Sequence, residues 1–157
     1  MLPKYRILFV CMGNICRSPA AHGVMEKLID REGLADRVEV DSAGTGGWHR
    51  GNLPDPRMRR HAAQRGYDLT SRARQVNSSD FHDFDLILVM DHQNLRDLQS
   101  FVRAPDDLRN VKLFCEFVKD RSETEVPDPY YGGDEGFETV LDLVENGCAE
   151  ILRTIPK

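Results

Sequence analysis

The feature that most constrains the fold is a short polar loop between an apolar run and a helical pattern. The apolar run covers residues 5–10, Cys11-Met-Gly-Asn-Ile-Cys-Arg17-Ser18 follows it, and Pro19 comes next. This order predicts a buried strand, a tight loop and the N-terminus of a helix. Free backbone N–H groups and the positive end of the helix dipole then point at one place, which is predicted to bind an anion.

The residue types in this loop suit a tetrahedral oxyanion held above a sulfur atom. Cys11 opens the loop and Arg17 closes it, with five residues between them, and a guanidinium can clamp two oxygens of the anion. Gly13 lets the backbone approach the anion, and Asn14 tolerates left-handed backbone angles. Ser18 can cap the helix and also bond the sulfur. These positive surroundings favour the thiolate, so Cys11 is predicted to be a nucleophile.

The rest of the chain alternates between strand and helix patterns. Strands are predicted at 5–10, 38–40, 85–90 and 111–114, and helices from Pro19 to about Gly33, from Asp55 to about Arg65, over 92–102 and from Asp134 to about Ile155. Such alternation predicts an α/β fold, a parallel sheet with helices on both faces. Because Cys11, the loop 41–47 and Asp91 each follow a strand, they are expected to share the rim where ligands bind.

Length, charge and cysteine usage narrow the class of protein. A chain of 157 residues predicts one domain, 1–157, and its formal charge of −5 argues against nucleic acid as a partner. Neither a membrane-spanning run nor a signal-peptide pattern is visible, so no membrane association is expected. The four cysteines follow neither a secreted disulfide framework nor a zinc-finger spacing. The cytoplasm is therefore the expected compartment, and no metal or cofactor is expected.

The segment Val10-Cys-Met-Gly-Asn-Ile-Cys-Arg-Ser-Pro19 resembles the active-site loop of the low-molecular-weight protein tyrosine phosphatases. A bare Cys-x5-Arg pattern is weak, but here the preceding strand and the following Ser-Pro make it specific. The resemblance covers nearly the whole chain. It implies four parallel strands in the order 2-1-3-4 and hydrolysis of phosphotyrosine through a cysteinyl-phosphate. It also implies phosphotyrosine proteins as substrates, with a cognate tyrosine kinase as one candidate, and a monomer.

Loss of a tyrosine phenolate needs a proton donor, and a positioned carboxyl typically contributes about 10²- to 10⁴-fold to the rate. Two Asp-Pro pairs compete for this role. Asp55-Pro56 leads into a helix and is interpreted as an N-cap followed by a first-turn proline. Asp128-Pro-Tyr-Tyr-Gly-Gly133 lies in a loop and resembles the acid loop of the family. Asp128 is therefore the predicted general acid and base, with a capping role as the alternative.

Aromatic residues are predicted to form the walls of a substrate cleft. At least one of Tyr130 and Tyr131 is expected to line it, and Trp48 resembles the family's aromatic residue on the opposite wall, with a buried anchor as the alternative. Stacked rings would hold phosphotyrosine, and the depth of the cleft would exclude phosphoserine. Asn52 and Asp91 could orient the rim, and Asp91 could equally cap the helix 92–102. The predicted phosphate- and substrate-binding residues are Met12, Gly13, Asn14, Ile15, Cys16, Ser18, Trp48, Tyr130 and Tyr131.

Three further features have more than one interpretation. Cys16 either packs as a small buried residue or, as in the family, forms a disulfide with oxidised Cys11, whereas Cys115 and Cys148 are interpreted as core residues. Six arginines between residues 57 and 74 are interpreted as a solvated face, with acidic partners as the alternative. The matching tract of the family usually has a histidine at the position of Ser71, and that histidine helps to hydrogen-bond the serine and asparagine of the active-site loop. By this resemblance Ser71, whose side chain is shorter, would support Asn14 and Ser18 either directly or through a water molecule.

Two relatives of this active-site loop give alternative functions. Thiol-dependent arsenate reductases share the loop but need extra redox cysteines, and residues 75–95 contain none. Phosphoarginine phosphatases of the family carry threonine where this chain has Ile15. The sequence therefore favours phosphotyrosine over phosphoarginine as the substrate, and it favours either of these phosphatase activities over arsenate reduction. A phosphate-binding module without activity would tolerate the loss of Cys11 or Asp128, and both are present.

Overall fold

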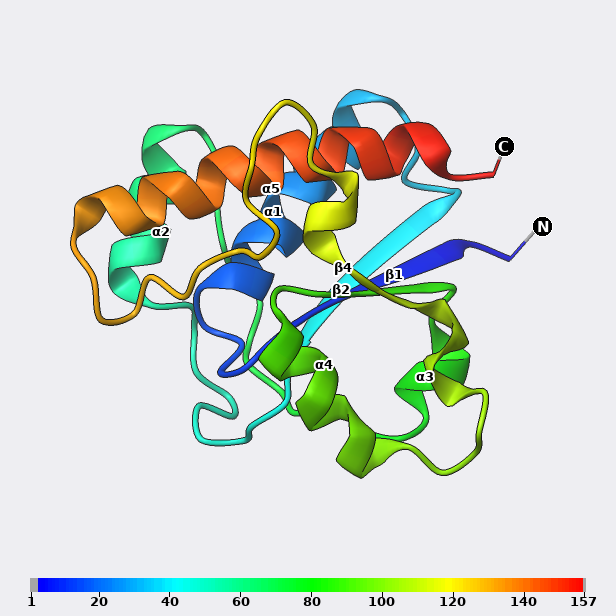
Figure 1. Ribbon diagram of the computed structural model, residues 1–157. Helices are drawn as coiled ribbons and strands as arrows, with labels where there is room; N and C mark the ends of the chain where they lie inside the picture. The colour runs from blue at the N-terminus through cyan, green and yellow to red at the C-terminus, as the bar shows by residue number, and fades with distance from the viewer. Residues whose placement is uncertain (1–2, 157) are drawn as a thin grey trace.

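A computed structural model describes residues 3–156 of the chain. Its centre is a four-stranded sheet (Figure 1), in which all neighbouring strands run parallel in the order β2-β1-β3-β4. The predicted sheet and its strand order are confirmed. The strands are β1 (Tyr5–Cys11), β2 (Val38–Gly44), β3 (Leu86–Val89) and β4 (Val111–Leu113).

Helices cover both faces of the sheet, as predicted, because alternate residues of the buried strands point to opposite sides. Ile7 and Phe9 of β1 belong to the larger core, and Leu8 and Val10 belong to the smaller one. The larger core packs beneath α1 (Arg17–Arg31), α2 (Pro56–Gln64) and α5 (Asp134–Thr154); the smaller core packs beneath α3 (Asp80–Asp83) and α4 (His92–Leu98).

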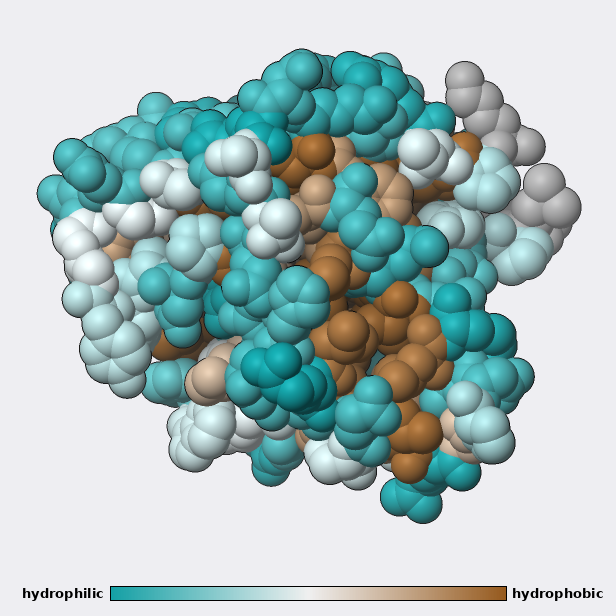
Figure 2. Space-filling model, viewed as in Figure 1, coloured by the Kyte–Doolittle hydropathy of each residue, from teal (hydrophilic) through white to brown (hydrophobic). Residues whose placement is uncertain are grey.

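The smaller core reaches the surface of the molecule. Figure 2 shows apolar side chains gathered between α4 and α3, below β4. Two short helices of 7 and 4 residues cannot close this face completely. Its partly buried apolar residues are Leu95, Phe101, Val102, Leu108, Val111 and Leu113.

The boundaries of three elements differ from the sequence prediction. Strand β2 continues to Gly44, because residues 41–44 pair with residues 8–11 of β1 although they resemble a loop in sequence. Helix α4 ends at Leu98 and tightens into a 3₁₀ turn, Gln99–Phe101, ahead of Pro105, whose ring disfavours helix in the residue before it. Helix α1 begins at Arg17, two residues before Pro19.

Two helix ends agree with the prediction. Gly33 and Gly66 follow α1 and α2 with φ angles of 68° and 88°, the left-handed conformation that commonly ends a helix. Three 3₁₀ segments complete the chain: Gln99–Phe101, Asp107–Asn110 and Phe114–Phe117. Among the helices of residues 3–156, none combines the length and the apolar character needed to cross a membrane.

Candidate active site

The loop between β1 and α1 is held in shape by a chain of polar side chains. Cys11 Sγ lies 3.0 Å from Ser18 Oγ, and Asn14 Nδ2 donates to the same Ser18 oxygen at 2.7 Å. Because Asn14 occupies that oxygen as an acceptor, the Ser18 hydroxyl hydrogen is free to point at the sulfur. Asn14 has the predicted left-handed backbone, with φ of 55°, and its Oδ1 accepts from the Arg74 backbone N–H at 3.0 Å.

Ser18 does not cap the helix, so that part of the sequence prediction is wrong. The N-cap of α1 is Cys16, no side chain caps it, and Ser18 lies within the first turn. Its hydroxyl is directed to Cys11 and Asn14 instead. The first N–H groups of α1 have no capping side chain, and these are the groups that bind anions at a helix N-terminus.

The loop that follows β2 supports the backbone of this segment from the side. Thr45 N–H donates to the Cys11 carbonyl, and Gly46 N–H donates to the Met12 carbonyl, each at 2.9 Å. A Cβ atom at Gly44 would lie 2.7 Å from the Met12 oxygen, so this close approach requires glycine. The sequence signalled the contact only through the glycine-rich stretch itself.

Arg17 is almost fully buried, with 2% of its surface exposed. Its Nη1 donates to Asp91 Oδ2 at 2.6 Å and to the Val126 carbonyl at 3.0 Å. Burial would lower the pKa of Arg17, but the negative charges of Cys11 and Asp91 outweigh it and the pKa is raised. The guanidinium is therefore a fixed positive charge beside the cysteine.

Asp91 performs both of the functions that the sequence left open. One carboxylate oxygen holds Arg17, and the other accepts from the Asn94 backbone N–H at 2.8 Å and so caps α4. Asn52, the second candidate for orienting the rim, is exposed and is absent from the cavity that Cys11 lines.

The loop of residues 128–133, termed the acid loop below, brings Asp128 to the same site. Asp128 Oδ2 lies 3.7 Å from Arg17 Nη2, and its Oδ1 accepts from the Tyr130 backbone N–H at 3.0 Å. The other Asp-Pro aspartate, Asp55, accepts from the Arg57 backbone N–H at 2.8 Å and is the N-cap of α2, as predicted.

These groups surround one cavity of about 470 Å³. Trp48 is 74% exposed and Tyr131 93% exposed, so Trp48 is not a buried anchor and Tyr131 is not a core residue. Asn14 and Ser18 are buried and support the loop from beneath. His49 lies on the wall, and no sequence motif had marked it. The lining residues are Cys11, Met12, Gly13, Ile15, Cys16, Arg17, Trp48, His49, Asp128, Tyr130 and Tyr131.

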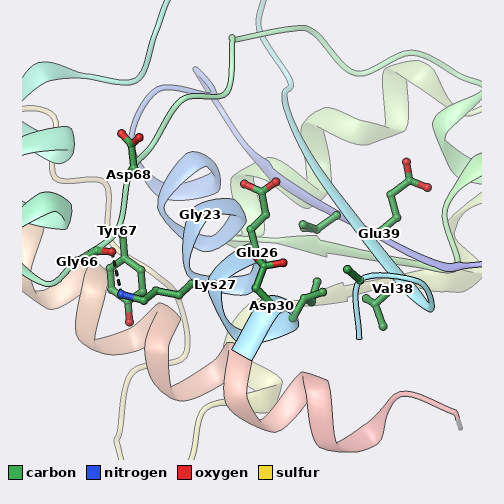
Figure 3. Close-up of a pocket in the computed structure, with 12 residues that line it drawn as sticks. Gly23, Glu26, Lys27, Asp30, Val38, Glu39, Gly66, Tyr67 and Asp68 are labelled. Carbon is green, nitrogen blue, oxygen red and sulfur yellow. Dashed lines mark hydrogen bonds between the residues drawn. The ribbon is translucent and has the colours of Figure 1, made fainter. Parts of the chain in front are cut away.

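A larger cavity, of about 610 Å³, lies between α1, the start of β2 and the segment 66–68 (Figure 3). Its lining has one cation, Lys27, whose ammonium donates to the Gly66 carbonyl at 2.9 Å. A negatively charged lining repels phosphate, and no cysteine contributes to it. The smaller cavity, with Arg17 and Cys11 in its lining, is therefore the better candidate for an anion site. The carboxylates of the larger one come from Glu26, Asp30, Glu39 and Asp68.

The arginines between residues 57 and 74 do not form one solvated face, so that interpretation is wrong. Arg57 pairs with Asp55, and Arg74 pairs with both Asp41 and Asp80. Arg65 contacts three acidic residues of α5 within 2.9 Å: Glu138, Asp142 and Glu145.

A parallel sheet of this order, with a cysteine–arginine loop after its first strand and a carboxyl beside it, is the arrangement expected of a cysteine-dependent protein phosphatase. The family model of the low molecular weight phosphotyrosine protein phosphatases matches residues 6–157. The chain belongs to this family.

Individual relatives match over nearly their full lengths. A low molecular weight protein-tyrosine-phosphatase of Streptomyces coelicolor is 42% identical, over 96% of this chain and 93% of its own. A protein tyrosine phosphatase of Entamoeba histolytica, solved with Hepes in its active site, superposes with a TM-score of 0.91 at 42% identity, over 96% of both chains. An arginine phosphatase of Drosophila gives 0.86 at 30% identity, over 94% of this chain and 95% of its own.

Proposed function

We propose that this protein hydrolyses phosphotyrosine in two steps, with Cys11 as nucleophile, Arg17 as phosphate clamp and Asp128 as acid and then base. The observation that carries the proposal is the cavity in which Cys11, bonded to Ser18, lies beside the buried Arg17, with Asp128 3.7 Å from that guanidinium.

In the first step, the Cys11 thiolate attacks phosphorus and forms the S–P bond while the bond from phosphorus to the phenol oxygen breaks. Asp128 gives its proton to that leaving oxygen. Arg17 and the backbone N–H groups of the loop bind the equatorial oxygens, where charge accumulates. In the second step, water attacks the cysteinyl-phosphate and gives a proton to Asp128. The S–P bond breaks, releasing inorganic phosphate and restoring both the thiolate and the protonated acid.

Phosphotyrosine-containing proteins are the substrates that the family membership supports. A cognate tyrosine kinase is one candidate among them. Every group in the mechanism comes from a single chain, which supports action as a monomer. The cytoplasm is the proposed compartment, because a reactive cysteine thiolate needs reducing surroundings.

The choice between phosphotyrosine and phosphoarginine is expected to depend on Ile15, which lines the cavity and is 9% exposed. Its apolar side chain suits a phenyl ring, whereas the N–H groups of a guanidinium would lack partners. One unpaired buried donor costs about 1–3 kcal/mol, or roughly ten- to a hundredfold in specificity. We expect a clear preference for phosphotyrosine, and Ile15→Thr should shift it toward phosphoarginine.

The measurement is kcat/KM on matched phosphotyrosine, phosphoserine and phosphoarginine peptides, without added metal. If the wild-type protein preferred phosphoarginine, its function would instead be that of an arginine phosphatase. The observation that supports this alternative is the similarity to the arginine phosphatase of Drosophila.

A second prediction concerns oxidation. Cys16 lines the same cavity as Cys11, and burial, with a contribution from Asp55, raises the pKa of its thiol. Peroxide is expected to oxidise Cys11 to a sulfenic acid, and the Cys16 thiol then displaces water to form a disulfide that a thiol reductant reverses. Cys16→Ser should make the inactivation irreversible. Mass spectrometry that found Cys11 joined to Cys115 or Cys148, or no disulfide, would contradict this prediction.

A further inference from the structure

Arg57 joins the acid loop to the start of α2. Its Nε and Nη2 pair with both oxygens of Asp55, at 3.1 and 2.9 Å, and Nη2 also donates to the Tyr130 carbonyl at 3.0 Å. The guanidinium carbon lies 5.4 Å from the centre of the Tyr130 ring and 4.9 Å from that of Phe137. Arg57 thus contacts the acid loop twice, through a hydrogen bond to the Tyr130 backbone and through a cation–π contact with the Tyr130 ring.

The same side chain is connected to the nucleophile loop. Asp55 N–H donates to the Ile15 carbonyl at 2.8 Å, so the residue that holds Arg57 is itself bonded to the loop of Cys11. On the far side of Arg57, Tyr130 N–H donates to Asp128 Oδ1 at 3.0 Å. A continuous chain of hydrogen bonds therefore connects the nucleophile loop to the carboxyl of Asp128.

The acid loop has few other attachments. Across residues 3–156, the bond from Arg57 is the one hydrogen bond that reaches residues 128–133 from any earlier part of the chain. Gly132 N–H bonds within the loop, to the Pro129 carbonyl at 3.0 Å, and Tyr131 is 93% exposed at the rim of the cavity. The loop is also held by the buried Pro129 and by the longer ion pair between Arg17 Nη2 and Asp128 Oδ2, at 3.7 Å. Arg57 is therefore the residue that fixes the backbone of this loop by a hydrogen bond.

The ion pair that anchors Arg57 is suited to persist at working pH. Asp55 is 7% exposed, and burial would raise the pKa of its carboxyl. The hydrogen bonds from Arg57 outweigh burial, and the pKa of Asp55 is lowered. The carboxylate stays charged well into the acid range, and so does the pair.

We propose that Arg57 is the positioning residue of the general acid: it fixes the acid loop against the nucleophile loop and so holds Asp128 over the leaving oxygen. The inference rests on the proposed role of Asp128. A displacement of about 1 Å in a catalytic group can cost roughly a hundredfold in rate, and the bond from Arg57 prevents such a displacement.

The test is a double-mutant cycle on aryl phosphates whose leaving phenols differ in pKa. Arg57→Ala is expected to lower kcat/KM about ten- to a hundredfold for poor leaving groups and little for good ones. Binding of inorganic phosphate should be unchanged. In an Asp128→Ala background, Arg57→Ala should cost nothing further, because there is no acid left to position. Arg57→Lys keeps the charge without the fork and should recover part of the loss.

Arg59→Ala is the matched control, because Arg59 lies on the same helix and its side chain makes no hydrogen bond or ion pair within residues 3–156. It should leave the leaving-group dependence intact. Equal losses from Arg57→Ala for all leaving groups, or the same loss in the Asp128→Ala background, would assign Arg57 a general structural role and overturn the inference. If Asp128→Ala alone lowered kcat/KM by the same factor for every leaving group, the proposed role of Asp128 would be wrong as well. The failure of the proposed function can therefore be told apart from the failure of the inference about Arg57.

Discussion

Replacing Cys11 with serine is expected to abolish turnover while the cavity keeps its affinity for inorganic phosphate. A serine hydroxyl does not ionise near neutral pH, so no covalent intermediate forms. The phosphate cradle survives, because Arg17 remains held by Asp91 and Val126, and the loop remains tied to Thr45 and Gly46. Steady-state kinetics and calorimetric titration with phosphate measure the two properties separately.

Arg17→Ala is the matched comparison for this prediction. It removes the buried positive charge and leaves the Asp91 carboxylate unpaired beside the anion site, so both turnover and phosphate binding should be lost. If Cys11→Ser kept more than a few per cent of wild-type activity, the covalent mechanism would be wrong.

The nucleophile loop could be predicted from the sequence because its chemistry is local. Cys11, Asn14 and Arg17 lie within seven consecutive residues, and the flanking strand and helix patterns fix how they meet. Asp91 could be predicted as well, since residues that follow parallel strands collect at one edge of the sheet. Asp128 lies far from any strand end, and it could be predicted only from its Asp-Pro loop and the resemblance of that loop to the family's acid loop. The strand order followed from the family resemblance and is confirmed.

The contacts that support the loop could not be predicted, because they join segments far apart in the sequence through irregular backbone. No periodicity places Gly44 against the Met12 carbonyl or His49 on the wall of the cavity. Arg57 and Arg74 belong to a run of basic residues whose pattern says nothing about their partners. Their carboxylate partners became visible only in the folded chain.

The departure at Ser71 illustrates the same limit. The family resemblance suggested that this residue would support Asn14 and Ser18, directly or through water. Within residues 3–156, no direct hydrogen bond joins Ser71 to either of them, and the Arg74 backbone N–H holds Asn14 instead. A backbone donor carries no sequence signal, so the substitution at position 71 could not reveal what supports the loop.

Asp128→Ala is expected to slow the release of poor leaving groups by about 10²- to 10⁴-fold and to affect good ones far less. A phenol of high pKa cannot leave as the anion without a proton, whereas a phenol of low pKa can. Asp128 is the carboxyl that lines the cavity; Asp91 is committed to Arg17 and the α4 cap, and Asp55 to Arg57. No other carboxyl among the lining residues of the described structure could replace it.

The measurement is a plot of log kcat/KM against the pKa of the leaving phenol, which should be shallow for the wild type and steep for Asp128→Ala. Asp134→Asn provides the control, since Asp134 begins α5 directly after the acid loop but stands 76% exposed, facing His61 and Arg60 instead of the cavity. That variant should keep the shallow slope. Parallel lines for wild type and Asp128→Ala, displaced by the same factor for every phenol, would mean that Asp128 transfers no proton in the transition state. In that case the acid would have to come from outside the carboxyl groups that line this cavity.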